Sequence, residues 1–359
     1  MLGKMLLLGG LFRCVQPVLS VCAALGYKSP FLCPLGKEAE ANAAKRELAG
    51  DTNSDHAALV AALDGWQRER HRFASRHFLS ANTLDYIARL RADLADGARE
   101  LLHRLPTDHT NPTYLADVLS ATLVAGLFPN LAWLRRFGKG ETCRGLKIVA
   151  HPGSVNARRG DALVSFYDIQ ETSERYLYDT TEVQMAPVLL FAHELPVVRR
   201  TSTHTTFRLA GWSVAVSASA ASELLALRAS LHAFIQRAVG EPPTQATDAA
   251  TEALSRVFSE HAPVVASGLM NDDDDDEDEG EEQQQSGVGG AVELIAAAAA
   301  PPASSKHAKR RGSSSAWNEE SDEDEMRTSD VGQRGAPPRK MEEEQAAPPP
   351  TSWDEDLQD

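Results

Sequence analysis

Cysteine is scarce in this 359-residue sequence, and the four cysteines do not pair by spacing. Cys14, Cys22, Cys33 and Cys143 form no C-x-x-C motif, and none has a histidine at zinc-ligand spacing. This pattern favours reduced, buried thiols in a cytosolic or nuclear protein over a disulfide framework or a zinc site.

Long hydrophobic runs are also missing. Residues 1–26 begin with one lysine and an apolar run, as a secretory signal does, but Arg13 interrupts the run and Gln16-Pro17 follows. No stretch approaches the roughly 18 apolar residues that a membrane span needs. We therefore expect no membrane partner and a pair of buried helices broken at Pro17, with a signal peptide as the alternative.

The sequence motifs of several enzyme classes are absent. There is no G-x-x-x-x-G-K-[ST] phosphate loop, no G-x-G-x-x-G, no H-E-x-x-H and no G-x-S-x-G. The segment "FGKGETCRG" (137–145) contains glycine and lysine without the phosphate-loop spacing. The residues alone therefore predict no catalytic side chains, no metal site and no independent enzyme.

Basic residues are outnumbered by acidic residues only in the last quarter of the chain. Residues 271–359 hold 25 acidic and 8 basic residues, whereas the rest is close to neutral despite the overall net charge of −15. This balance permits a nucleic-acid partner for residues 1–270. We expect a disordered, acidic, low-complexity tail over 246–359, because such a composition cannot bury enough apolar surface to fold.

Two readings remain open for each charged segment of that tail. The basic "KHAKRR" (306–311) is either a nuclear-localisation signal or a cluster that balances nearby acids. The acidic run either keeps the chain soluble or competes with nucleic acid for a basic surface.

Residues 1–105 have the periodicity of helices. "GKEAEANAAKRELA" (36–49) is rich in good helix formers, and Ser54-Asp55 provides a cap for the next helix. Between Ser80 and Pro106, apolar residues recur every three or four positions, which predicts a long amphipathic helix. Further helices are expected over 113–128 and 222–240.

Short strands are expected between those last two helices. The candidates are "GLKIVAH", "ALVSFYDI", "ERYLYD", "MAPVLLFA" and "FRLAGWSVAV", all rich in β-branched or aromatic residues. About five strands at short spacing predict a small barrel or sandwich.

Six blocks, in order, resemble one protein family. They are residues 2–31, 36–66, "FLSANTL" (78–84), "LVAGLFPNLAWL" (123–134), "VAHPGSVN" (149–156) and "YLYDTTEV" (176–183). Together they resemble the helicase-associated region and the closing OB-fold of DEAH-box ATP-dependent RNA helicases. "RELAGDTNSDH" (46–56) and "YLYDTTEV" look most like the branch that includes the G-quadruplex-resolving helicase.

The resemblance implies an α+β multidomain fold. An all-α ratchet bundle (1–105) would precede a small β-barrel, an OB-fold with leading and closing helices (106–245), and then the acidic tail. The family's two RecA-like domains and winged helix are missing from this sequence, so ATP and Mg²⁺ would bind elsewhere and the chain is not expected to hydrolyse ATP alone. The sequence is expected to be either the tail of a truncated gene model or a split accessory piece, in the nucleus or cytoplasm.

In such helicases the ratchet and OB-fold would form one wall of a tunnel for single-stranded RNA. Structured RNA, a helicase-activating protein, and RecA and winged-helix domains in cis are further expected partners. The resemblance points to nucleic-acid contacts at His151, Ser154, Asn156, Lys147, Arg158, Arg159, Lys28 and Ser29. A standalone single-strand RNA-binding regulator and a protein-docking scaffold are the alternative functions.

Several of these site residues also have a purely structural reading; for Lys28 and Ser29 it is the end of a helix before Pro30. His151 would then end a strand and cap a carbonyl, and Arg158-Arg159 would be solvated loop residues. Tyr176 and Tyr178 alternate on a predicted strand, so we expect them to pack rather than to stack on bases. Trp66 is expected in the core of the helical region.

Overall fold

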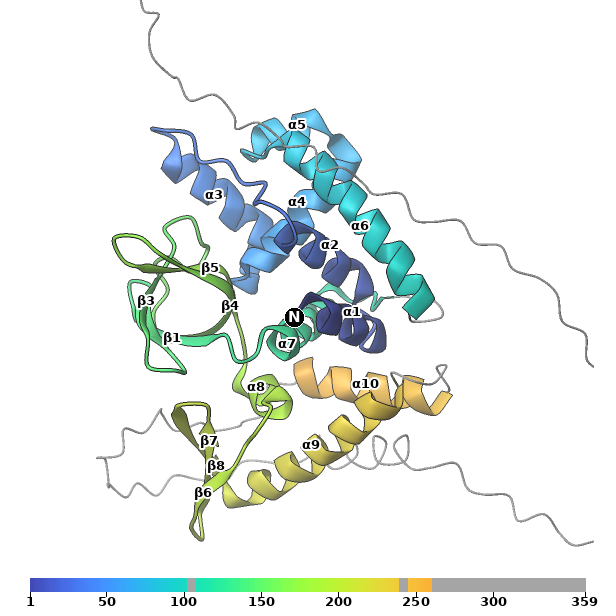
Figure 1. Cartoon of the computed structure of the whole chain (residues 1–359), viewed down its shortest axis with the longest axis vertical. Helices are drawn as coiled ribbons and strands as arrows, with labels where there is room; N and C mark the ends of the chain where they lie inside the picture. The colour runs from blue at the N-terminus through green and yellow to red at the C-terminus, as the bar shows by residue number, and fades with distance from the viewer. Residues whose placement is uncertain (102–107, 239–244, 260–359) are drawn as a thin grey trace, which may run out of the picture. The chain divides into compact units, whose positions relative to one another are not determined.

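The structure is a computed structural model that describes residues 1–101, 108–238 and 245–259. Figure 1 shows its helices and strands. The first helices are α1 (Leu2–Leu11), α2 (Val15–Leu25), α3 (Glu38–Ala49), α4 (Asp55–Glu69), α5 (His71–Arg76), α6 (Ala81–Leu101) and α7 (Pro112–Leu127), with a 3₁₀ turn at Gly50–Thr52. The helices up to α6 lie in the predicted all-α region, and Trp66 is buried in its core as expected, whereas α7 is the helix expected over 113–128.

The local signals behind α3, α4 and α6 are confirmed. Ser54 caps α4, because its Oγ accepts a hydrogen bond from the Ala57 amide at 3.0 Å. On α6, Leu84 and Ile87 are buried and Arg89 is exposed, as the amphipathic period predicts. The predicted continuation of this helix to residue 105 lies beyond the described range.

The break between the first two helices is not at Pro17. α1 ends at Leu11, and α2 begins at Val15, so Pro17 lies in the first turn of α2. Proline is tolerated there because the first amides of a helix have no partner within it. Among the described residues, no helix has the length and apolar character to cross a membrane.

A closed barrel follows α7. Its strands are β1 (Leu131–Arg136), β2 (Lys139–Thr142), β3 (Lys147–Ala150), β4 (Ala162–Glu171) and β5 (Arg175–Glu182). They pair in the order β1-β2-β3-β5-β4, and β4 returns to β1. Only β3 and β5 run parallel; the other neighbours are antiparallel. This five-stranded closed barrel is consistent with the OB-fold that the resemblance implies.

Two of the predicted strands were wrong. "MAPVLLFA" is helix α8 (Met185–Phe191), because a short, continuous apolar run has no period that separates strand from helix. "FRLAGWSVAV" is a hairpin outside the barrel. It forms β7 (His204–Leu209) and β8 (Trp212–Ser217), which make a separate sheet with β6 (Val197–Arg200). The barrel strands β1 and β2 were missed, since arginines end β1 and β2 is short and polar.

Two helices close the described part of the chain. α9 (Ala218–Ala238) is the predicted closing helix, and its expected cap at Gly240 lies outside the described residues. α10 (Gln245–Ser259) falls within the segment assigned to the acidic tail. It is a packed helix because Leu254 and Phe258 are buried, and the Phe258 ring lies 5.5 Å from that of Phe12. The remainder of the predicted tail lies outside the described residues.

Candidate nucleic-acid interface

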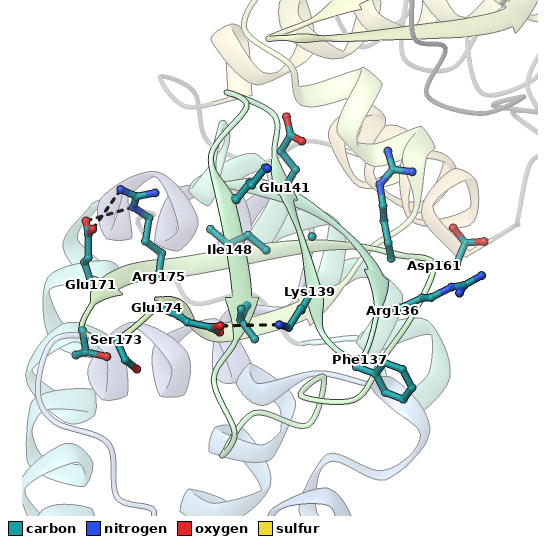
Figure 2. Close-up of a pocket in the computed structure, with 15 residues that line it drawn as sticks. Arg136, Phe137, Lys139, Glu141, Ile148, Asp161, Glu171, Ser173, Glu174 and Arg175 are labelled. Carbon is teal, nitrogen blue, oxygen red and sulfur yellow. Dashed lines mark hydrogen bonds and ion pairs between the residues drawn. The ribbon is translucent and has the colours of Figure 1, made fainter.

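A wide groove crosses the outer face of the barrel (Figure 2). It has a volume of about 1030 Å³ and runs over β2 and β3, between the β1–β2 turn and the β4–β5 loop. The lining residues are Arg135, Arg136, Phe137, Lys139, Gly140, Glu141, Lys147, Ile148, Val149, Asp161, Glu171, Thr172, Ser173, Glu174 and Arg175. Strands 2 and 3 and these two loops are where OB-folds bind oligonucleotides and oligosaccharides.

The β1–β2 turn presents an aromatic ring at the end of this groove. Phe137 is 79% exposed and has a left-handed φ of 52°. Gly138 follows with φ 70°, and a Cβ at this position would lie only 2.4 Å from the Ala157 carbonyl oxygen. The Gly138 amide donates to the Arg159 carbonyl at 2.9 Å. The turn is therefore held against the backbone of Ala157 and Arg159, and Phe137 points away from the barrel (Figure 2). An exposed ring is suited to stacking on a nucleobase.

The basic side chains that line the groove differ in whether they form ion pairs. Arg175 pairs with Glu171 at 3.1 Å, and Lys139 reaches Glu174 across the groove at 3.8 Å. Within the described part of the chain, no ion pair joins Arg136 or Lys147 to a carboxylate, and both are exposed. These two cations are therefore available to the phosphates of a bound strand.

His151 follows β3 and lies beside β5, where its amide donates to the Leu177 carbonyl at 3.0 Å. The outward positions of β3 are Lys147 and Val149, and His151 is the next one along. Val149 is the register partner of Tyr176. The His151 ring stacks on Tyr178, with centroids 4.4 Å apart, and meets Tyr176 edge-on at 5.9 Å. The two tyrosines are thus packed against a neighbour, as expected, and they form a half-buried aromatic cluster with His151.

The protonation state of His151 follows from its contacts. Its Nδ1 accepts a hydrogen bond from the Gly153 amide at 3.0 Å, so the ring proton is on Nε2. Burial, with a contribution from the Lys45 charge, lowers the pKa of this imidazole. His151 therefore offers a neutral ring and one N–H donor rather than a positive charge.

Ser154 and Asn156 lie in a different environment from the one expected. Both are buried, with relative exposures of 4% and 0%. Ser154 Oγ donates to Asp55 Oδ2 at 2.7 Å, and Asn156 Nδ2 donates to the Asn53 carbonyl at 3.0 Å and to Thr180 Oγ1 at 2.8 Å. Their polar groups therefore hold the turn of residues 151–156 against the helical region.

Asp55 is the centre of this junction. Its fully buried carboxylate pairs with Lys45 at 2.8 Å and accepts hydrogen bonds from the Val155 and Thr180 amides at 3.0 and 2.9 Å. Burial opposes ionisation, but the Lys45 charge and the hydrogen bonds from Lys45, Ser154 and Val155 lower the pKa of the Asp55 carboxyl overall. One carboxylate from α4 thus fixes both the turn after β3 and the middle of β5.

Neighbouring contacts extend the junction along the chain. Ser54 Oγ and His56 Nδ1 both lie 2.7 Å from Thr181 Oγ1. The Glu182 amide donates to the Asn53 carbonyl at 3.1 Å. Burial lowers the pKa of His56 to about 4, so this side chain is neutral at pH 7. Figure 1 shows α3 and α4 beside the barrel at this junction.

The remaining four predicted residues are not among those that line the groove. Arg159 forms a two-pronged pair with Glu182, with its Nε at 2.9 Å, whereas Arg158 is exposed. Lys28 and Ser29 are exposed on the helical region, after α2. Of the predicted site, the structure places Lys147 and His151 on one face of the barrel.

Sequence reasoning missed Phe137, Arg136 and Lys139. Their signal is visible in "RRFGKG" (135–140), where an aromatic residue at a glycine turn is flanked by cations. Among the described residues, no cluster of His, Cys, Asp and Glu side chains is arranged to hold a metal ion.

Two family models match the chain. "Helicase associated domain (HA2), ratchet-like" matches residues 1–80, and "Oligonucleotide/oligosaccharide-binding (OB)-fold" matches residues 119–195. The second match contains the whole closed barrel and its groove.

Curated relatives agree with these matches. The chain is 33% identical to the ATP-dependent DNA/RNA helicase DHX36 of Homo sapiens over 264 residues, which is 67% of this chain and 26% of the relative. It is 36% identical to the DExH-box ATP-dependent RNA helicase DExH1 of Arabidopsis thaliana over 54% of this chain and 21% of that protein. A putative ATP-dependent RNA helicase, DHX57 of Mus musculus, is 32% identical over 37% of the chain and 12% of its own length.

The chain thus spans about a quarter of the length of the first two relatives. The ratchet-like helices, the closed barrel and these identities lead to one assignment. The chain matches the helicase-associated and OB-fold region of DEAH/DExH-box ATP-dependent RNA helicases.

Proposed function

We propose that this chain is the nucleic-acid-binding C-terminal module of a DEAH-box RNA helicase and that it holds single-stranded RNA along the outer face of its barrel. The relatives are named as DNA/RNA or RNA helicases, which supports nucleic acid as the ligand. The groove over β2 and β3 supports the barrel face as the place of binding.

Each residue of this face has a defined task in the proposal. Phe137 stacks on a base at one end of the groove, and His151 stacks on another beside Tyr178. Arg136 and Lys147 meet phosphates, and Arg158 adds charge beside the turn. Ser154 and Asn156 act indirectly, because they hold the turn that carries His151. Lys28 and Ser29 contact the strand on the helical region.

The rest of the helicase cycle belongs to other domains. The ratchet-like helices and the barrel form one wall of the strand's tunnel, and RecA-like and winged-helix domains complete it in cis. Those domains bind ATP and Mg²⁺, since this sequence has no phosphate loop or DEAH box. The module by itself therefore binds RNA without hydrolysing ATP.

The observation that carries this proposal is that the exposed ring of Phe137 lines the same groove as Arg136 and Lys147, two cations without an ion pair among the described residues. The test uses the full chain and a fluorescently labelled single-stranded RNA, with binding measured by anisotropy. Phe137→Ala is expected to weaken binding about tenfold, because stacking on one base contributes about 1–3 kcal/mol. Phe137→Trp keeps the ring and is the matched control, expected to bind as the parent does.

Two results would contradict the proposal. Equal affinity of the Phe137→Ala and Phe137→Trp variants would remove this turn from the site. An absence of RNA binding by the parent chain would instead favour the protein-docking scaffold.

A further inference from the structure

A second aromatic surface lies on the helical region, away from the barrel groove. We call it the tyrosine patch and define it by Tyr27, Lys28, Tyr86 and Arg89. Tyr27 follows α2, and Tyr86 is on α6, two helices that pack side by side (Figure 1). The two tyrosine rings are 43% and 49% exposed.

The two rings form a preassembled pair. Their centroids lie 4.2 Å apart with an interplanar angle of 32°. Gly26, at the end of α2, lies against α6, since a Cβ at this position would be in van der Waals contact with Leu90 Cδ2 at 3.5 Å. The close packing of the α2 end on α6 thus holds Tyr27 against Tyr86. A flat ligand that stacks on this pair meets rings that are already ordered, which lowers the entropic cost of binding.

Positive charge surrounds the ring pair. Lys28 Nζ lies 5.5 Å from the centre of the Tyr27 ring. Arg89 is exposed and three residues after Tyr86 on the same helix, so the two side chains are neighbours on its surface. The acid beside Tyr86, Asp85, is paired with Arg70 at 3.6 Å. The patch therefore combines an aromatic platform with cations.

We propose that the tyrosine patch is a second single-strand contact, where a nucleobase stacks on Tyr27 and Tyr86 while Lys28 and Arg89 meet the adjoining phosphates. This combination of flat rings and cations fits a strand that carries bases and phosphates together. The inference rests on the proposed function, but it uses residues that are separate from the groove. An acidic protein segment would satisfy the cations without the need for an aromatic platform.

The test separates stacking from simple apolar contact. In the full chain, the double variant Tyr27→Leu/Tyr86→Leu keeps apolar bulk and loses the rings, whereas Tyr27→Phe/Tyr86→Phe keeps the rings and loses the hydroxyls. Anisotropy with labelled single-stranded RNA is expected to show about tenfold weaker binding for the leucine variant and near-parental binding for the phenylalanine variant. Leu35→Ala, at a 97% exposed side chain outside the patch, is the control expected to change nothing.

A direct readout accompanies the affinities. RNA that carries 5-iodouridine should crosslink under ultraviolet light to peptides that contain Tyr27 or Tyr86, as detected by mass spectrometry. Parental affinity of the leucine variant, with Phe137→Ala still weakened, would overturn the tyrosine patch and leave the groove in place. No RNA binding by the parent chain would overturn both, and equal losses in the leucine and phenylalanine variants would overturn stacking as the mechanism.

Discussion

Two turns of the barrel differ in accessibility, because the hydroxyl and amide side chains of one are buried and the aromatic ring of the other is exposed. The turn at 151–156 contains a hydroxyl and an amide, and both donate to protein acceptors around Asp55. The β1–β2 turn contains only Phe137 and Gly138, between cations, and its ring is in solvent. The turn with more hydrogen-bonding groups is thus the less accessible one.

The difference follows from where the nearest carboxylate lies. Asp55 is 99 residues from Ser154 in the sequence, yet it is buried against the turn and needs donors to remain ionised. The hydrogen bond that the Gly138 amide of the β1–β2 turn donates goes instead to a backbone carbonyl, that of Arg159. The sequence of a polar turn therefore shows which hydrogen-bonding groups the turn contains. Buried charges elsewhere in the fold decide whether a ligand can reach those groups.

The largest expected effect on stability comes from removal of the Asp55 carboxylate from the buried junction. Asp55→Ala leaves Lys45 without its partner and Thr180 and Val155 without their acceptor, so the free energy of unfolding should fall by about 3–5 kcal/mol. Urea unfolding followed by circular dichroism measures it. Asp51→Asn, at an exposed acid just before α4, is the matched control and should unfold as the parent does. An equally mild effect of both variants would contradict the central role of Asp55.

The comparison of the two turns predicts that stability and RNA affinity respond to different substitutions. Ser154→Ala should lower the free energy of unfolding by about 1–3 kcal/mol, because it removes a buried hydrogen bond to a carboxylate, and leave RNA affinity nearly unchanged in the folded protein. Phe137→Ala should do the reverse. Urea unfolding and anisotropy on the same two preparations give all four values. If folded Ser154→Ala protein lost more RNA affinity than the about fivefold expected for His151→Ala, the hydroxyl would instead be assigned to the RNA.

Asp179 gives the junction a pH dependence of a definite sign. Burial raises the pKa of its carboxyl to about 6; Lys45 opposes this shift, and Asp55 and Asp168 add to it. The unfolded value is about 3.9, so the folded state binds the proton more tightly. The resulting stabilisation is complete below pH 3.9 and is lost as the pH rises through 6.

Asp179→Asn should therefore be more stable than the parent at pH 7.5. Asparagine resembles the protonated acid and also tolerates the left-handed φ of 51° at this position. The difference in unfolding free energy should shrink as the pH is lowered to 4, measured by urea unfolding across this range. A difference that is independent of pH would show that the charge of Asp179 is not its source.

The smallest of these effects concerns His151. One face of its ring is taken by Tyr178, so His151→Ala should weaken RNA binding only about fivefold, the lower end of a single stacking contact. The imidazole is neutral, so the slope of affinity against salt concentration should not change. A shallower slope in this variant would mean that His151 is charged in the complex.

The sequence predicted those parts of the fold whose signals are local. The cap at Ser54 and the apolar period of α6 are properties of neighbouring residues, and both appear in the structure. The order of strands in the barrel depends on contacts between distant segments, and no order was predicted; family resemblance led only to the OB-fold as a whole. α8 was missed because tertiary burial surrounds a run that is apolar on every side.

The candidate site divides in the same way. The accessibility of Lys147 was foreseeable from its place at the polar start of a strand. The burial of Ser154 and Asn156 was not, because it depends on α4. Phe137 was overlooked because an exposed aromatic residue has no periodic signal in the sequence. The neighbouring glycine and cations are the only signal that could have indicated it.

The most direct test of the open barrel face as the RNA site is the salt dependence of binding. Anisotropy titrations of the full chain at several salt concentrations would compare the parent with Arg136→Ala/Lys147→Ala. The account predicts a steep decline of affinity with salt for the parent and a slope shallower by about 1.4 for the double variant, since each phosphate contact on a single strand contributes about 0.7. An unchanged slope would show that these cations do not touch the RNA and would contradict the assignment of the groove.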